Sequence, residues 1–248
     1  MRLIPYPLQH LLRSSCLLCA GDAGMAPVCA ACEADFPPLP ASCPRCALPS
    51  PAGAACGACL AHPPSFEATI ALWRYAFPVD RMIGAFKYHS RLALAAFFAA
   101  RLASRVAALG ALGSARFVLP ACAGHPLPIA GPDMLVPMPL HPQRLAERGF
   151  NQALEIARVA AVMTGIALKA HAAHRTRSTQ AQTELAWAER KQNLRGAFVC
   201  DTVVSGRSVA LLDDVMTTGA TLEELAKALK RAGAVRVENW VIARTLPD

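Results

Sequence analysis

The chain has 248 residues, of which 54% are hydrophobic and 17% charged, and its 25 Lys and Arg outnumber its 17 Asp and Glu to give a net charge of +8. This length and apolar content allow a full α/β core with a small accessory module. The most apolar segment, residues 92–112, carries Arg101 and Arg105, which favours a packed helix and argues against a membrane span. Prolines and polar residues interrupt the apolar run at the N-terminus, so we expect no signal peptide and a cytoplasmic protein.

Eight of the ten cysteines lie within the first 59 residues, as four CxxC pairs separated by nine or ten residues. A CxxC turn presents two thiolates to one tetrahedral metal ion, and a second such turn completes a Cys₄ site. We therefore expect two structural zinc sites. The first pair should join the second and the third the fourth, because each repeat then folds locally. The expected ligands are Cys16, Cys19, Cys29, Cys32, Cys43, Cys46, Cys56 and Cys59.

Three other kinds of cysteine chemistry fit this pattern less well. Disulfides need an oxidising compartment, thioredoxin-like redox chemistry uses a single CxxC pair, and iron–sulfur ligation usually shows tighter or less regular spacing. A closed Cys₄ site leaves no open coordination position, so the metal should hold the fold and not catalyse a reaction. We expect residues 1–62 to form a double zinc-ribbon module and residues 63–248 to form the second domain.

The second domain is expected to open with a strand over residues 70–75 and a helix over residues 79–108. Lys87 lies in this helix between two aromatic residues, where it would contact a phosphate or stack with a nucleobase. The alternative is a lysine on the surface of a helix with no ligand. Residues 110–131 are rich in Gly and Pro, which predicts an irregular connector.

A short apolar strand is predicted over residues 134–136, followed by prolines and a helix over residues 150–161. The proline-rich turn after the strand lies next to Arg144 and Arg148, which indicates either a second anion pocket or a rigid turn with surface arginines. Between residues 141 and 195 nine Lys and Arg face four Glu. Such a basic excess suits a polyanionic ligand, whether pyrophosphate or nucleic acid, although a generally basic surface would show the same excess.

After a short strand over residues 168–170, the segment 171–195 is polar and basic, and its last part (184–195) is predicted to be helical. Arg175 and Arg177 belong to this segment. Because the guanidinium fork matches phosphate oxygens, we expect a lid that closes over a phosphorylated ligand. A loop with no role in ligand binding is the alternative.

The most informative segment is VALLDDVMTTGAT, residues 209–221. Its apolar run predicts a buried strand over residues 209–212, and the carboxylates of Asp213 and Asp214 suit ribose hydroxyls or a Mg²⁺ ion. The following loop, residues 215–220, can direct backbone N–H groups and threonine hydroxyls at a phosphate, helped by the N-terminus of a helix over residues 222–231. An ordinary strand–helix connection would explain the apolar run and the helix, but not this sequence of acidic residues, threonines and glycine. A last strand is predicted over residues 235–243.

The same segment resembles the motif that binds phosphoribosyl diphosphate (PRPP) in type I phosphoribosyltransferases, at all thirteen positions. With the cysteine-rich front end and the segments FKYHSRLALA, VPMPLHPQRLAERGFNQA and RTRSTQAQTELAWAERKQNLRGAF, the chain from Cys16 to Thr245 resembles the ComF/GntX-like competence family. The resemblance implies an α/β fold: a small double zinc ribbon followed by a mostly parallel sheet flanked by helices. The ligand would lie at the carboxyl ends of the strands.

Position by position, the resemblance implies that Asp213 and Asp214 face the ribose hydroxyls and Mg²⁺. The other implied roles are the 5′-phosphate for Thr217, Thr218, Gly219, Ala220 and Thr221, and pyrophosphate or the flexible loop for Pro139, Leu140, His141, Arg175 and Arg177. From their local setting, and not from the resemblance, we expect Lys87, Arg144 and Arg148 to contact nucleic acid. The chain departs from the family pattern in its long Gly/Pro-rich stretch at 110–131 and in Met138 and Met216, where Val is usual.

The implied function is a role in natural transformation and DNA uptake, with PRPP or a related ribose phosphate and single-stranded DNA as ligands and DNA-processing proteins as further partners. One alternative is an active phosphoribosyltransferase that transfers the phosphoribosyl group from PRPP to an unidentified acceptor. Another is a regulator that senses PRPP and signals through the zinc ribbon to a protein. Fold alone does not decide among these functions.

Overall fold

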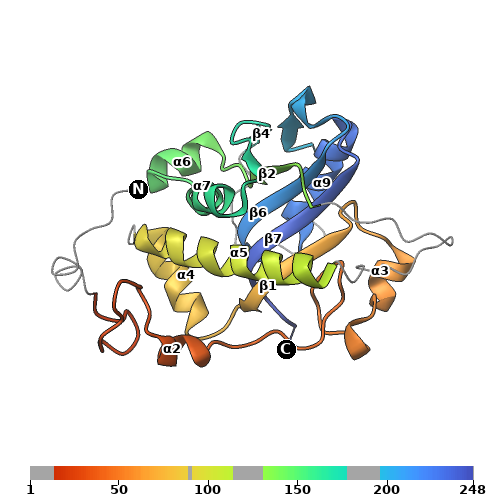
Figure 1. The fold of residues 1–248 in the computed structure, drawn as a ribbon. Coiled ribbons are helices and arrows are strands. Elements are labelled where there is room, and N and C mark those ends of the chain that lie inside the picture. The colour runs from red at the N-terminus through yellow and green to blue at the C-terminus, as the bar shows by residue number, and fades with distance from the viewer. Residues whose placement is uncertain (1–13, 89–90, 114–130, 178–195, 248) are drawn as a thin grey trace.

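The computed structural model describes residues 14–88, 91–113, 131–177 and 196–247. At its centre lies a five-stranded parallel sheet with the strand order β1-β7-β6-β2-β3 (Figure 1). Its strands are β1 (Ala68–Arg74), β2 (Met134–Pro137), β3 (Ala167–Leu168), β6 (Ser208–Met216) and β7 (Arg236–Arg244). A separate antiparallel pair consists of β4 (Ala173–Arg175) and β5 (Phe198–Cys200). The mostly parallel α/β architecture expected from the sequence is therefore confirmed.

The helices cover both faces of this sheet. They are α2 (Ala30–Ala34), α3 (Gly57–Ala61), α4 (Val79–Tyr88), α5 (Ala93–Gly113), α6 (Pro142–Arg148), α7 (Gln152–Thr164) and α9 (Ala220–Arg231), with short 3₁₀ turns η2 (Pro51–Gly53) and η3 (Thr202–Val204). The connections β1–β2 and β2–β3 cross the sheet in one direction and β6–β7 in the other. Because such crossovers are right-handed, α5 and α7 lie on one face and α9 on the other.

The two central strands, β6 and β7, are buried on both faces. Residues 209–212 of β6 and 240–243 of β7 are 0% exposed, and Trp240 is the largest of these side chains. Strands of a parallel sheet covered by helices on both faces read as continuous apolar runs, and these two four-residue segments follow that rule, although β7 also buries Glu238 and Asn239 just before its apolar run. On β6 the acidic residues Asp213 and Asp214 follow the apolar run as the strand approaches its carboxyl end, which places them at the edge of the core.

In the region of residues 79–131, two boundaries differ from the sequence predictions. The single helix predicted over residues 79–108 is two helices, α4 and α5, and the second begins after a turn in which Leu94 N–H donates to the Arg91 carbonyl at 2.9 Å. The helices divide because α5 packs along the sheet and α7, whereas α4 ends at the carboxyl end of β6. In addition, α5 continues to Gly113 into the predicted connector, of which residues 114–130 lie outside the described residues.

Each predicted strand has a counterpart, but β6 continues to Met216 instead of ending at Leu212. It continues because its pairing with β7 persists through Val215 and Met216. The two aspartates therefore belong to the last part of a strand and not to the loop after it. Likewise β2 includes Pro137, which was predicted to stop it, because that residue still lies in register with Leu212.

Helix α5 is the one helix among the described residues that is long and apolar enough, by length and composition, to cross a membrane. In this fold one face of α5 packs on the core, where Leu94, Phe98 and Leu102 are 0% exposed. The guanidinium of Arg101, on the same helix, pairs with Glu33 of α2, with 2.6 Å between Nη2 and Oε2. The helix thus serves here as a packing element, as predicted.

The cysteine-rich segment packs onto the sheet domain through an aromatic cluster. The Phe36 ring lies 5.1 Å from the Trp73 ring of β1 and 6.3 Å from the Phe97 ring of α5, both edge to face. Phe36 is 4% exposed. Aromatic pairs in this geometry contribute beyond the apolar area that they bury, so this contact fixes the front of the chain to the sheet.

Candidate functional site

The centre of the candidate site is the carboxyl end of β6. Asp213 and Asp214 are consecutive residues of this strand, so their side chains leave it on opposite faces. Asp214 is 8% exposed, and its Oδ2 lies 2.9 Å from the Lys87 ammonium at the end of α4. Asp213 Oδ1 accepts a hydrogen bond of 2.8 Å from the Asp214 N–H. The fold therefore joins two predicted site residues, Lys87 and Asp214, in one ion pair.

The charge of Asp213 is costly in this position. Burial and the neighbouring Asp214 carboxylate raise the pKa of Asp213 from 3.8 to about 7, against the opposing charges of Lys87 and Arg175. Two carboxylates held this close repel each other unless a cation or a proton intervenes. This end of β6 is thus suited to a divalent cation or to hydroxyl donors such as those of a ribose.

A three-residue loop, Thr217 to Gly219, connects β6 to α9. It is shorter than the predicted loop, residues 215–220, because the strand extends further and the helix begins already at Ala220. Gly219 is the N-cap residue with φ +80°, and an added Cβ would lie 2.6 Å from Met216 Cε, so this position requires glycine. The Thr218 hydroxyl accepts from the Ala220 N–H at 3.3 Å.

This loop presents the features of an anion site. Thr217 and Thr218 are exposed, while Gly219, Ala220 and Thr221 are partly exposed at the N-terminus of a twelve-residue helix. The first N–H groups of a helix have no partner within the helix and carry partial positive charge, which together favour a phosphate. All five residues predicted to bind phosphate therefore lie in one turn, directly after the aspartates.

The turn formed by Pro139, Leu140 and His141 follows β2 at the same edge of the sheet as this loop, because β2 pairs parallel with β6. Its start is held by the Met138 N–H, which donates to Leu212 at 2.8 Å. Asn151 Nδ2 donates to the Met138 carbonyl at 3.0 Å. His141 caps α6, and its Nδ1 accepts from the Gln143 N–H at 3.3 Å. Asn151 was not identified from the sequence as a residue that holds this turn. Its position as the N-cap of α7, close after the turn, is the feature of the sequence that could have indicated it.

Arg175 lies in β4 and not in a flexible loop, which corrects the position implied by the resemblance. It pairs in register with Phe198, and its guanidinium lies 5.7 Å from that ring centre. Burial and the charge of Arg144 lower the pKa of Arg175, and the charge of Asp213 raises it. Arg175 is therefore within electrostatic reach of both a second arginine and the aspartates.

Most of the predicted lid lies outside the described residues, namely 178–195, and with it the helix predicted over 184–195. Arg177 is among the described residues and is exposed. It lies two residues beyond Arg175, the last residue of β4. The antiparallel pairing of β4 with β5 brings the two ends of that segment together.

The remaining predicted cations lie on α4 and α6. The guanidinium of Arg148 lies 5.5 Å from the ring centre of Tyr88, which is 70% exposed, and Arg148 Nη1 donates to Gln152 Oε1 at 3.0 Å. Tyr88 directly follows Lys87, so a cation–aromatic pair lies next to the ion pair at Asp214. Arg144 is one turn earlier on α6 and partly exposed.

Arg244, the last residue of β7, is a member of the site that sequence reasoning missed. It is 2% exposed, and its Nη1 donates to the carbonyls of Met216, at 2.9 Å, and Thr217. These carbonyls lie where β6 passes into the loop of residues 217–219, which we call the phosphate loop after its predicted ligand. The signal in the sequence was an arginine at the end of an apolar run, VIAR, where a charge must have a structural reason.

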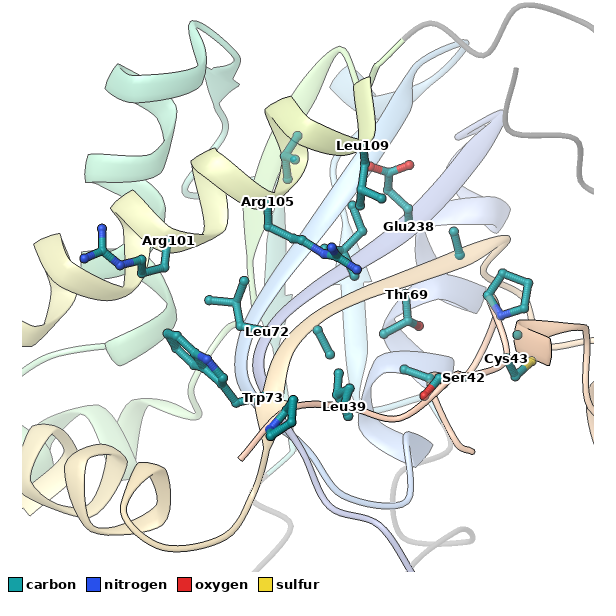
Figure 2. A pocket seen from close by; sticks show the side chains of 18 of the residues that line it. Leu39, Ser42, Cys43, Thr69, Leu72, Trp73, Arg101, Arg105, Leu109 and Glu238 are labelled. Atoms are coloured by element: carbon teal, nitrogen blue, oxygen red, sulfur yellow. The ribbon is translucent and has the colours of Figure 1, made fainter. Parts of the chain in front are cut away.

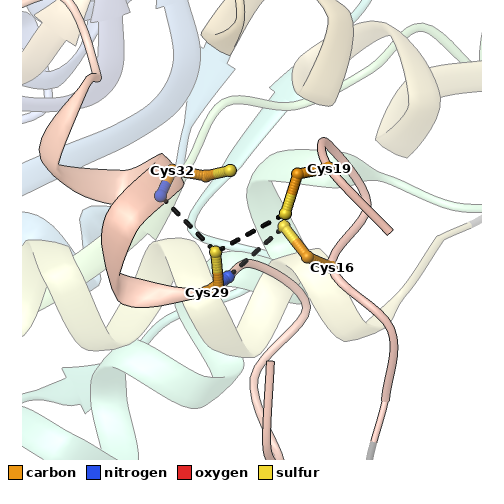
Figure 3. A group of neighbouring side chains, drawn as sticks. All are labelled: Cys16, Cys19, Cys29 and Cys32. Carbon is orange, nitrogen blue, oxygen red and sulfur yellow. Dashed lines mark hydrogen bonds between the residues drawn. The ribbon is translucent and has the colours of Figure 1, made fainter. Parts of the chain in front are cut away.

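The eight cysteines of the CxxC pairs form two clusters, grouped sequentially as expected: Cys16, Cys19, Cys29 and Cys32, then Cys43, Cys46, Cys56 and Cys59. In each cluster the four sulfurs lie within 4.8 Å of one another. A tetrahedral site with Zn–S bonds of about 2.3 Å separates neighbouring sulfurs by about 3.8 Å. Cys19 and Cys29 sulfurs are 3.8 Å apart (Figure 3), and those of Cys46 and Cys56 3.7 Å. Both clusters therefore fit a structural zinc ion.

Backbone N–H groups point at these sulfurs and favour thiolates. The Leu18 N–H lies 3.4 Å from Cys16 Sγ. The Cys29 N–H lies at the same distance from this sulfur (Figure 3). Burial raises the pKa of Cys16, but hydrogen bonds from the backbone of Cys19, Cys29 and Leu18, together with the Cys19 side chain, outweigh it and lower the pKa to about 6. The first turn of the second cluster repeats this geometry, since Ala20 and Ala47 both follow a CxxC pair with positive φ. The two clusters are thus built as a structural repeat.

A cavity of about 990 Å³ lies between β1, the second half of α5 and residues 38–44, and no residue of β6 lines it (Figure 2). Thr69, Leu72 and Trp73 of β1 and Arg101, Arg105 and Leu109 of α5 contribute to its lining. No residue predicted to bind ribose phosphate lines it. The candidate site is therefore the open strand-end surface and not this hollow.

Comparison with known proteins supplies the family. The chain is 33% identical over 187 residues to the DNA utilization protein YhgH of Escherichia coli K12. This alignment covers 75% of this chain and 76% of that protein. The chain belongs to the ComF-like family. It is also 29% identical over 242 residues to competence protein F of Haemophilus influenzae, covering 96% of this chain and all of that protein. No model of a protein family matches the chain.

Among solved structures, the glutamine PRPP amidotransferase from B. subtilis aligns with 45% of this chain and 22% of its own, at 23% identity and a TM-score of 0.32. A purine phosphoribosyltransferase from Pyrococcus horikoshii aligns with 46% of this chain at 16% identity and a TM-score of 0.28. Likenesses of this size carry no argument about function. The family assignment therefore depends on the sequence relatives and on the two Cys₄ clusters.

Proposed function

We propose that this ComF-like protein binds PRPP or a related ribose phosphate with Mg²⁺ at the carboxyl end of β6, binds single-stranded DNA next to it, and acts in DNA uptake. The observation that carries the proposal is the arrangement of Asp213 and Asp214 at the end of a buried strand, followed at once by a three-residue loop and a helix N-terminus. The names of the relatives, DNA utilization protein and competence protein F, support the role in handling DNA.

The donor set at the aspartates fits a magnesium ion carried by a diphosphate. Mg²⁺ prefers oxygen ligands and usually binds through one or two carboxylates together with phosphates of the substrate. Asp214 is already paired with a cationic group, the Lys87 ammonium at 2.9 Å, which supports the preference of this position for a cation. Bound Mg²⁺ would supply the charge that offsets the diphosphate. Residues 217–221 would hold the 5′-phosphate, and the turn at Pro139 to His141 would face the diphosphate.

The DNA part of the proposal depends on the side chains around Tyr88. Single-stranded nucleic acids bind surfaces on which cations follow the backbone and aromatic rings stack on bases. Tyr88 is 70% exposed, Arg148 lies over its ring, and Lys87 and Arg144 lie nearby on α4 and α6. The net charge of +8 favours the same class of ligand.

Calorimetry with PRPP and Mg²⁺ tests the ribose-phosphate site. The substitutions Asp213→Asn and Asp214→Asn should each weaken PRPP binding about tenfold or more, because each removes a charged ligand. Asp133→Asn is the matched control: Asp133 Oδ2 accepts from the Ser208 N–H at 2.7 Å at the opposite end of β6, and Asn keeps an acceptor there. If the wild-type protein binds no PRPP at millimolar concentration, the proposal is wrong.

Fluorescence anisotropy with a labelled single-stranded oligonucleotide tests the DNA site. We expect binding that weakens with salt, and replacement of Lys87, Arg144 and Arg148 by Gln should lower the slope of log affinity against log salt by about 2. The control replaces three exposed arginines elsewhere, Arg105, Arg158 and Arg207, and changes net charge equally. Equal loss of affinity in both variants would assign the binding to net charge and contradict a defined site.

A further inference from the structure

The second cysteine cluster is attached to the strands that carry the candidate site. Three successive carbonyls of its first turn accept hydrogen bonds from the sheet: Pro44 from the Thr69 N–H, Arg45 from the Thr69 hydroxyl, and Cys46 from Arg244 Nε. The Arg244–Cys46 bond is 2.9 Å long and joins residues 198 positions apart. A turn held at three consecutive carbonyls cannot move without disturbing β1 and β7.

The same arginine holds the phosphate loop. Nη1 of Arg244 donates to the carbonyls of Met216, Thr217 and Thr245, of which the first and last are 2.9 and 2.8 Å away. The Thr245 N–H in turn donates to the Met216 carbonyl at 3.0 Å. One guanidinium therefore connects the metal-binding turn at Cys46 directly to the point where β6 becomes the phosphate loop.

Arg244 is a buried charge without a carboxylate partner among the salt bridges of the described residues, and it is 2% exposed. A charge buried in this way requires compensation. A zinc ion with four thiolates carries net negative charge, and Cys46 belongs to that ligand set. The arginine is therefore placed to balance the charge of the metal site while its other N–H groups hold the loop.

A second contact connects the same two regions. The carboxylate of Glu223, in the first turn of α9, accepts from the N–H and the hydroxyl of Ser65, at 2.8 and 2.9 Å. Ser65 lies between the second cluster and β1. The first cluster has a different attachment, because Glu33 next to its ligand Cys32 pairs with Arg101 of α5. Only the second cluster, within the described part of the chain, is thus joined to the loop and to the helix that follows it.

We propose that metal binding at Cys43, Cys46, Cys56 and Cys59 is coupled to ligand binding at the phosphate loop through Arg244, which acts as a positioning residue. The inference depends on the proposed ribose-phosphate site. Zinc in the second cluster raises the affinity of the loop for PRPP, and PRPP slows the loss of that zinc. Zinc in the first cluster is not coupled to PRPP. Coupling between two binding sites is reciprocal, so both effects follow from one interaction.

The test measures zinc release from the full chain into a chromogenic chelator, with and without saturating PRPP and Mg²⁺. In the wild-type protein one of two release phases should slow about fivefold or more, and the Cys16→Ser variant should keep that phase. Arg244→Lys retains the charge, but a lysine cannot reach Cys46 and Met216 at once. This variant should therefore abolish the protection, that is, the slowing of zinc release by PRPP. Arg101→Met, next to the first cluster, should keep it.

Two outcomes would overturn the inference. One is equal slowing of both phases by PRPP, or slowing of neither phase in a protein that calorimetry shows to bind PRPP. The other is protection that survives in Arg244→Lys with its two zinc ions present. A wild-type protein that binds no PRPP would remove the proposed site and this inference together, so calorimetry distinguishes the two failures.

Discussion

The ammonium of Lys87 lies 2.9 Å from Asp214 Oδ2, although the two residues belong to elements that the sequence separates by more than a hundred positions. Their side chains are 20% and 11% exposed, so water screens the pair only partly. In the protein without ligand, Lys87 therefore holds the position at Asp214 that a metal ion would use. Binding of a divalent cation at this carboxylate must compete with the lysine.

Substitution Lys87→Gln should consequently raise the affinity of the free protein for divalent cations, by about three- to tenfold, because the competing ammonium is gone. Titration with Mn²⁺ followed by electron paramagnetic resonance would measure this change. Arg81→Gln on the same helix is exposed and serves as the control for net charge. Unchanged Mn²⁺ affinity in Lys87→Gln would show that the ion pair does not oppose metal binding.

Substitution Gly219→Ala should destabilise the protein and weaken PRPP binding. Its φ of +80° costs an alanine about 1 kcal/mol, and the new Cβ would lie 2.6 Å from Met216 Cε, so the buried Met216 side chain next to the phosphate loop would have to move. Gly206→Ala is the matched control, with φ +70° and nothing within 4 Å of the added Cβ. Urea unfolding should show a loss in both variants, whereas calorimetry should show loss of PRPP affinity in Gly219→Ala alone.

Asp213 predicts a pH dependence of stability in the protein without metal. Burial and Asp214 raise its pKa from 3.8 to about 7, so the folded state holds the proton more tightly than the unfolded state. The resulting stability is fully present below pH 4 and is lost as the pH rises through about 7. Asp213→Asn should therefore stabilise the protein more at pH 8 than at pH 5 in urea unfolding. An equal effect at both pH values would contradict this.

Substitution Phe36→Ala tests whether the cysteine-rich segment is energetically part of the fold. Phe36 is 4% exposed and contacts Trp73 and Phe97, so its removal should lower the free energy of unfolding by about 3 kcal/mol. Met25→Ala in the same repeat, 71% exposed, should change it little. Chemical denaturation of both zinc-loaded variants measures the difference. A small effect of Phe36→Ala would show that the segment unfolds separately from the sheet.

Much of the site could be predicted because its chemistry is contiguous along the chain. Residues 213–221 place the carboxylates, the loop and the helix start within nine positions, and short-range geometry then brings them together. The pairing of the cysteines followed from the same locality. Predictions were wrong where neighbours in space decide the boundary: β6 continues to Met216 because β7 pairs with it there, and the helix at Tyr88 ends because its last turn meets Asp214.

The sequence by itself therefore determined two Cys₄ clusters, a parallel α/β sheet and the contiguous segment that we propose binds ribose phosphate, since hydrophobic periodicity and ligand spacing are properties of short segments. Tertiary structure alone decided that Lys87 forms an ion pair with Asp214, that Arg175 lies in a strand, and that Arg244 joins Cys46 to Met216 by hydrogen bonds. These contacts connect residues up to 198 positions apart. They form only when packing of the core brings buried polar groups within reach of the hydrogen bonds they require.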